Sequence, residues 1–228
     1  MKYGHYSDNE LKTFINWPFR CPSWDPVPDG KKNVVILGCS HTWGVGLEPN
    51  ETWAHLVSQH NTKLLRYWNL GQPGASAEAC VRILYSCEKV INPKIIIVCW
   101  PVLSRRERLE AKHIRNLHGP DERLQYEDDE TDMNNFLKSV FFLEKYAEKN
   151  QCKTFHCFAD TYIDFRNKQL KPAVLEKHTV KNCWPYWDKF NHREPSGPSL
   201  ARDGIHYGID NHKRFAALFL ERFKGKLK

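Results

Sequence analysis

The sequence predicts an α/β fold, a three-layer α/β/α sandwich in which helices cover both faces of a mainly parallel sheet. Three observations predict it. Short apolar runs alternate along the chain with segments of helical periodicity. The run 95–99 is continuously apolar, which suits a strand buried on both faces. The chain has 228 residues, of which 41% are hydrophobic and 27% charged, the size and composition of one globular domain.

The elements follow in an alternating order. Strands are predicted at 33–37, 64–70, 94–100 and 152–158. Helices are predicted at 52–60, after the Gly71–Gly74 turn, at 131–149 and at 210–223. The second, third and fourth helices carry apolar stripes at spacings of three and four: Cys80, Ile83, Leu84, Cys87, Val90 and Ile91; Met133, Phe136, Val140, Leu143 and Ala147; Phe215, Leu218, Phe219 and Phe223. Each stripe is expected to pack on the sheet.

Three long segments lie outside this alternation, at about 1–32, 102–130 and 161–202. We expect a single domain spanning 1–228, with these segments as elaborated loops that act as lids or binding walls. The first and third contain aromatic residues that either form a platform for a ligand ring or pack beneath the loops: Trp17, Trp24, Trp184, Tyr186 and Trp187.

Composition narrows the function classes. The longest apolar runs are too short to cross a bilayer of about 30 Å, and charged residues interrupt the amino-terminal segment, so neither a membrane span nor a secretory signal is predicted. The eight cysteines form no CxxC pair, which favours reduced thiols in a cytoplasmic protein and no metal site. The net charge of +7 comes from scattered basic residues without a nucleic-acid-binding motif, so nucleic acid is not the expected partner.

Chemically suited residues follow the first strand and precede the last helix. Ser40 stands just after the strand, where open α/β sheets bind ligands. Asp203 and His206 supply a base and a group to orient it, as a nucleophilic serine requires. Alone, such a serine is commonly a helix cap and an Asp-x-x-His commonplace. Their combination predicts a catalytic triad of Ser40, Asp203 and His206, and no cofactor.

The same segments carry a family resemblance. Gly38–Gly44 resembles the first conserved block of the SGNH (GDSL-like) hydrolases, a family with a flavodoxin-like fold, although Cys39 replaces the usual Asp. Asn69–Gly74 is similar to the second block, which implies that the N–H groups of Ser40 and Gly74 form the oxyanion hole. Asp203–His206 resembles the block with the base and its orienting carboxylate.

The third block departs from the family pattern. The family places an Asn soon after the third strand, and this chain has none between Cys99 and Glu107. The nearest candidate substrate ligands are Trp100, Ser104, Arg105 and Arg106. One arginine could complete the oxyanion hole or hold an anionic or sugar substrate. The alternative is an arginine paired with Glu107 or Glu110 on an exposed turn.

The sequence therefore predicts a serine ester hydrolase acting on small acyl esters, with O-acetyl groups on carbohydrate as the favoured substrate and a small-molecule or glycan ester as the partner. The alternatives are an acyltransferase with the same triad, or a binding protein on a catalytically weakened scaffold. The Gly-x-Ser-x-Gly elbow of the α/β-hydrolases is not present, because position 42 is Thr. The sequence predicts no oligomeric state.

Overall fold

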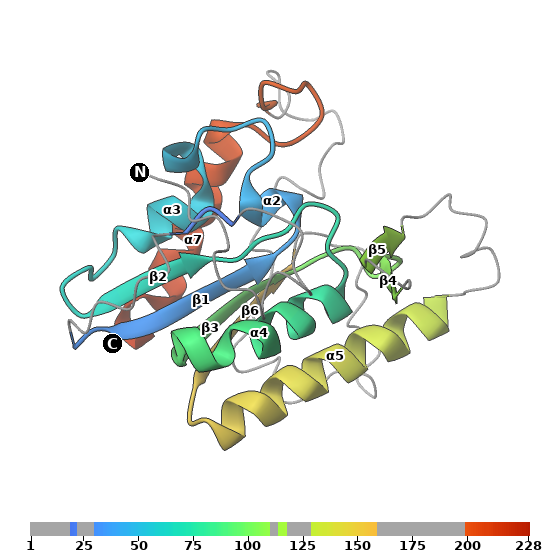
Figure 1. Ribbon diagram of the computed structural model, residues 1–228. Coiled ribbons are helices and arrows are strands. Elements are labelled where there is room, and N and C mark those ends of the chain that lie inside the picture. Colours follow the sequence, from blue (N-terminus) through green and yellow to red (C-terminus); the bar gives the residue numbers. More distant parts are fainter. Residues whose placement is uncertain (1–18, 22–29, 110–113, 118–128, 159–198) are drawn as a thin grey trace.

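A computed structural model of the protein describes residues 19–21, 30–109, 114–117, 129–158 and 199–228 (Figure 1). Its centre is a four-stranded sheet in the order β2-β1-β3-β6, and every neighbouring pair is parallel. The strands are β1 (Lys32–Gly38), β2 (Leu65–Asn69), β3 (Pro93–Trp100) and β6 (Lys153–Phe158). The predicted parallel sheet is confirmed.

Helices cover both faces of this sheet, as Figure 1 shows. Helices α4 and α5 lie on one face, and α2, α3 and α7 lie on the other. Their bounds are α2 (Ser40–Trp43), α3 (Trp53–Ser58), α4 (Ala77–Ile91), α5 (Asp129–Lys149) and α7 (Ile209–Phe223). Two short 3-10 helices are η1 (Pro49–Glu51) and η4 (Lys224–Lys226). The three-layer α/β/α sandwich is therefore confirmed.

Alternation along the central strands divides the interior into two cores. Because successive side chains of a strand point to opposite faces, Val35 packs with α4 and α5, whereas Val34 packs with α3 and α7. In β3, Ile96 and Ile97 divide in the same way. This double burial explains why the sequence of β3 is continuously apolar rather than alternating.

Local sequence explains where α4 and α3 begin. The Ser76 hydroxyl caps α4 by accepting a hydrogen bond from the Ala79 N–H at 3.2 Å. Thr52 caps α3 in the same way, with the His55 N–H as donor at 3.2 Å. The predicted stripe of α4 is buried except at its end, where Val90 is 37% exposed, so the inward placement of Val90 was wrong.

The segment predicted as an irregular loop at 102–130 contains regular structure. An antiparallel hairpin pairs β4 (Arg106–Leu109) with β5 (Ile114–Leu117). Most of the other two long segments, including the five aromatic residues proposed as a platform, lies outside the described residues. The single-domain assignment therefore stays a prediction. Within the described ranges, no helix combines the length and apolar character needed to cross a membrane.

Candidate active site

Ser40 is the first residue of α2, directly after the carboxyl end of β1. At the end of β1, Gly38 has a φ of +155°, and a Cβ there would lie 2.1 Å from the Thr42 Oγ1 and 2.8 Å from the Cys99 carbonyl oxygen. Only glycine permits this close turn. Ser40 is 5% exposed. The tight turn thus fixes the serine at the sheet edge where parallel α/β folds bind ligands.

The Asp203–His206 turn is built around one carboxylate. Asp203 Oδ1 accepts hydrogen bonds from the N–H groups of Ile205 and His206, both at 3.0 Å. Asp203 Oδ2 lies 2.5 Å from Nδ1 of the His206 ring. This contact favours the tautomer that carries its proton on Nδ1, which leaves Nε2 as an acceptor. A base with that tautomer can remove a hydroxyl proton.

The same contacts stabilise the carboxylate. Partial burial would raise the pKa of Asp203, but the hydrogen bonds from the His206 and Ile205 N–H groups and the His206 ring outweigh it and hold the pKa below its ordinary value. Asp203 therefore stays ionised at neutral pH, as an orienting group for a histidine requires.

Several contacts hold this turn against the loop that follows Ser40. The Arg202 N–H donates to the Gly46 carbonyl oxygen at 3.0 Å, and its guanidinium pairs with both carboxylate oxygens of Glu51 at 2.6 and 2.8 Å. A Cβ on Gly46 would lie 3.0 Å from the Asp203 Cγ. The turn and the α2 loop therefore fit closely together. The hydrogen bond between Ser40 and His206 stays a prediction.

Two histidines that the sequence analysis did not select complete this region. The His41 ring lies edge-on to the His206 ring with centroids 5.5 Å apart. His212, on α7, accepts a hydrogen bond from the Trp53 N–H at 3.0 Å and so ties α7 to the start of α3. Burial, followed by the positive charges of His206 and Arg20, lowers the pKa of His212 to about 3. Neither histidine has a spacing motif that could have identified it.

The loop between β2 and α4 lies against α2. The Asn69 side chain accepts from the Gly71 N–H and donates to the Thr42 carbonyl oxygen, both at 3.0 Å. The Gln72 N–H donates to the Gly38 carbonyl oxygen at 2.9 Å. Gly74 has a φ of +77°, which favours glycine. These contacts place the second block beside the first, and the role of the Gly74 N–H in an oxyanion hole stays a prediction.

The structure corrects two of the four predicted substrate ligands. Trp100 is fully buried against Phe136, and its indole N–H donates to the Nδ1 of His156 at 2.9 Å, so it belongs to the core. Arg106 is 7% exposed, pairs with Asp132 and donates to the Leu103 carbonyl oxygen at 2.7 Å. These contacts consolidate the hairpin base rather than present Arg106 to a ligand.

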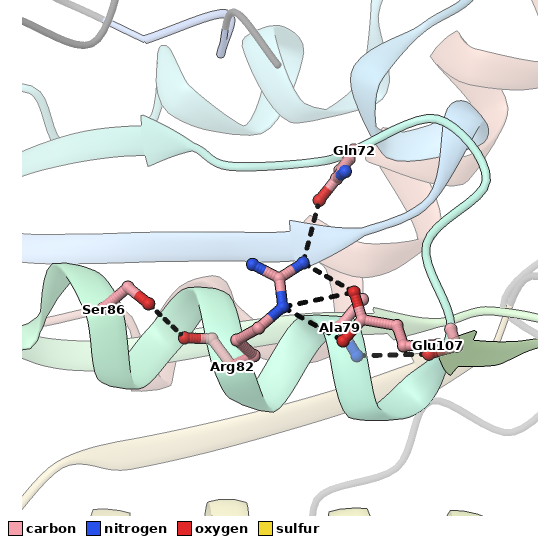
Figure 2. Close-up of polar contacts among 6 residues, drawn as sticks. Gln72, Ala79, Arg82, Ser86 and Glu107 are labelled. Atoms are coloured by element: carbon pink, nitrogen blue, oxygen red, sulfur yellow. Dashed lines mark hydrogen bonds and ion pairs between the residues drawn. The ribbon is translucent and has the colours of Figure 1, made fainter. Parts of the chain in front are cut away.

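Ser104 and Arg105 remain candidates. Both are half-buried and lie in the turn between β3 and β4. The alternative role predicted for an arginine of this turn is a pairing with Glu107. Arg105 does not have that role, because Glu107 pairs with Arg82 of α4 at 2.6 Å. Figure 2 shows Arg82 between Glu107 and Gln72, with two guanidinium nitrogens on the carboxylate and a longer contact of 3.5 Å to the Gln72 Oε1. Glu110 lies outside the described residues.

Within the described part of the chain, no group of His, Cys, Asp and Glu residues is arranged to hold a metal ion.

Comparisons with known proteins identify the fold. No protein-family model matches the sequence, and no curated protein matches it. Among solved structures, TesA superposes with a TM-score of 0.60 at 13% identity, over 86% of this chain and 100% of its own. A lipolytic protein of the G-D-S-L family from Desulfitobacterium hafniense gives 0.53 at 16% identity, over 82% and 97%.

A two-domain esterase described as active on acetylated mannans gives a TM-score of 0.55 at 15% identity, over 86% of this chain and 50% of that one. Identities this low carry information about architecture rather than activity. The parallel sheet flanked by helices matches the architecture of these structures. The chain therefore has the fold of the GDSL-like, or SGNH, hydrolases.

Proposed function

We propose that the protein is a serine ester hydrolase in which Ser40 is the nucleophile, His206 the general base and Asp203 its orienting carboxylate. The contact of 2.5 Å between His206 Nδ1 and Asp203 Oδ2, on a turn that is held against the loop following Ser40, is the observation that carries this proposal. A carboxylate so placed stabilises the imidazolium that forms when the base takes a proton.

The proposed reaction has two steps. The Nε2 of His206 takes the Ser40 hydroxyl proton as the Oγ attacks the ester carbonyl carbon, and the N–H groups of Ser40 and Gly74 stabilise the resulting oxyanion. Its collapse breaks the ester bond, and the alcohol leaves with the proton from His206. Water then attacks the acyl-enzyme with His206 again as base, which releases the carboxylic acid and restores Ser40.

The proposed substrates are small acyl esters, with O-acetyl groups on carbohydrate as the favoured class. The structural similarity to an esterase described as active on acetylated mannans supports this class. An acyl-enzyme also serves transfer to another alcohol, so the acceptor separates a hydrolase from a transferase. A panel of acetylated sugars and short-chain nitrophenyl esters, measured with and without an acceptor alcohol, tests both.

Labelling with a fluorophosphonate tests the catalytic assignment directly. The native protein is expected to be labelled at Ser40, whereas Ser40→Ala abolishes labelling and His206→Ala slows it by orders of magnitude. Ser86→Ala is the matched control, because its hydroxyl donates to the Arg82 carbonyl oxygen of α4 away from the proposed triad. Unchanged labelling in both test variants would remove Ser40 and His206 from the chemistry. An unlabelled native protein would favour the binding-protein alternative.

A further inference from the structure

Arg105 holds a buried donor that is not satisfied. Among the described residues, its Nη1 atom is buried and has no hydrogen-bond partner. A guanidinium is always charged, and a buried N–H without an acceptor is costly. Such a group in a folded protein calls for an explanation, and a bound ligand is one that supplies the missing acceptor. Arg105 lies on the turn that follows β3, so a ligand there would lie beyond the carboxyl end of that strand.

The two residues that follow Arg105 in the sequence are fixed by ion pairs. Arg106 is held by Asp132 of α5, and Glu107 is held by Arg82 of α4. The Arg105 N–H itself donates to the Val102 carbonyl oxygen at 3.3 Å. The backbone that carries the Arg105 side chain is therefore preorganised, and a preorganised donor loses little entropy when a ligand binds.

Contacts also connect this turn to the proposed nucleophile. Gly38, two residues before Ser40, pairs with Cys99 in the register of β1 and β3. The segments that follow these two strands therefore leave the sheet at the same edge. Gln72 joins them, because its N–H donates to the Gly38 carbonyl oxygen and its side chain contacts Arg82, which holds Glu107 (Figure 2). The positive charge of Arg105 also acts on His41, where it adds to the larger effect of burial and to the charges of His206 and His212 in lowering the pKa of that ring.

We infer that Arg105 binds a negatively charged group of the ester substrate, so that the preferred substrate is an acyl ester that also carries a carboxylate or phosphate. This inference rests on the proposed function. The inference covers a charge on either the acyl or the alcohol portion, and the two positions are separated by the choice of ester.

The buried atoms without a hydrogen bond among the described residues also include Glu78 Oε2 and Thr42 Oγ1, neither of which requires such a ligand. Glu78 Oε2 belongs to a carboxylate in the first turn of α4, where the helix dipole stabilises negative charge. Thr42 Oγ1 is an uncharged hydroxyl packed against Gly38. Arg105 carries a permanent charge that no ion pair with a described residue balances, whereas the charge of Arg106 is paired with Asp132. An ester with a matching negative charge would supply a charge-assisted hydrogen bond.

Two matched pairs of esters test the inference. In the first, 3-acetoxybenzoate is compared with neutral 3-acetoxybenzamide, which places the charge on the alcohol portion. In the second, the 4-nitrophenyl monoester of succinate is compared with that of succinamate, which places it on the acyl portion. The native protein is expected to prefer the charged member of at least one pair by roughly ten- to a hundredfold in kcat/KM, the range of a charge-assisted hydrogen bond.

Variants of Arg105 then assign the preference. Arg105→Gln is expected to bring the charged-to-neutral ratio close to one, and Arg105→Lys to retain part of it. The ratio does not depend on the folded fraction, because both esters are measured on one sample. Lys94→Gln is the control, since it removes one positive charge from an exposed position at the opposite end of β3 and should leave the ratio unchanged.

Three results would overturn the inference. One is a native ratio near one in both pairs, and another is a ratio that Arg105→Gln leaves intact. The third is an equal loss of kcat on charged and neutral esters in Arg105→Gln, which would make Arg105 an oxyanion donor instead. Fluorophosphonate labelling of Ser40 separates these results from failure of the proposed function. Dissociation constants of the same esters with Ser40→Ala give the ratio without turnover.

Discussion

The imidazole rings of His41 and His206 lie edge to face, with their centroids 5.5 Å apart. Burial, with smaller contributions from the charges of His206, His212 and Arg105, holds the pKa of His41 well below its ordinary value. His41 is half-buried overall and its Nδ1 is fully buried. At neutral pH this neighbour is therefore uncharged and would not oppose a positive charge on His206 in its proposed role as base.

The lowered pKa values of His41 and His212 predict that stability falls in mild acid. The unfolded chain binds a proton at each histidine near pH 6.5, whereas the folded protein does not until much lower pH, near 3 for His212. The stability that comes from keeping these two histidines uncharged is thus fully present above pH 6.5 and is lost progressively as the pH falls below it. Between pH 7.5 and 5.5 each histidine is expected to cost up to about 1.4 kcal/mol in the free energy of unfolding.

His41→Phe checks this, because phenylalanine keeps a ring against His206 and Tyr207 but removes the titrating group. Urea unfolding at pH 7.5 and 5.5 should show a smaller acid loss in the variant than in the native protein. An equal loss in both would show that His41 does not contribute.

Asp203→Asn is expected to impair the chemistry while leaving the turn intact. An asparagine keeps an oxygen that can accept from the Ile205 and His206 N–H groups, but it directs an NH₂ donor at the Nδ1 of His206. That donor favours the wrong tautomer of the base, and in serine proteases the corresponding change lowers kcat by about 10⁴. We expect a loss on the order of 10² to 10⁴ in the labelling rate. An unchanged rate in a variant with native thermal stability would contradict the proposed role.

Gly46→Ala should disturb the site more than the fold. Gly46 has a φ of +75°, and an added Cβ would lie 2.8 Å from the Ala201 Cβ and 3.0 Å from the Asp203 Cγ. Gly30→Ala is the matched control, with a φ of +71° and open space around its Cβ. Both variants bear the backbone strain of about 1 kcal/mol, but only Gly46→Ala displaces the Asp203 turn. Equal activity of the two variants would argue against close packing there.

Breaking the Arg82–Glu107 pair should destabilise the protein measurably. The two side chains are 18% and 12% exposed, and the guanidinium makes hydrogen bonds to both carboxylate oxygens. Glu107→Gln leaves the Arg82 charge largely desolvated, at an expected cost of about 2–3 kcal/mol in the free energy of unfolding. Lys145→Gln breaks an exposed pair with Glu148 on α5 and should cost less than about 0.5 kcal/mol. Urea titrations compare them, and similar costs would contradict the argument.

The sequence could predict the features that depend on local pattern. The apolar runs of β1 and β3, the caps at Thr52 and Ser76 and the position of Ser40 after β1 all follow from residues close together in the chain. At most of the strand ends, the observed bound differs from the predicted one by one residue. Leu64, for example, is 58% exposed and precedes β2.

Features that depend on distant partners could not be predicted. The partner of Arg106 is Asp132 of α5, and the partner of Glu107 is Arg82 of α4, so neither pair has a sequence signal. Trp100 follows a strand as a ligand-binding aromatic residue would, yet packing against Phe136 places it in the core. Which of two adjacent arginines faces a ligand is decided by these tertiary contacts alone.

The position of α7 has a consequence for synthesis. His212 of this helix accepts a hydrogen bond from the Trp53 N–H at the start of α3, and the turn just before the helix carries Asp203 and His206. A growing polypeptide exposes β1 and Ser40 well before the groups proposed to activate that hydroxyl, which emerge with the segment that leads into α7. The nascent protein would therefore carry an inert serine until Asp203 and His206 have been synthesised, and reactivity would appear only once their turn has packed against the α2 loop.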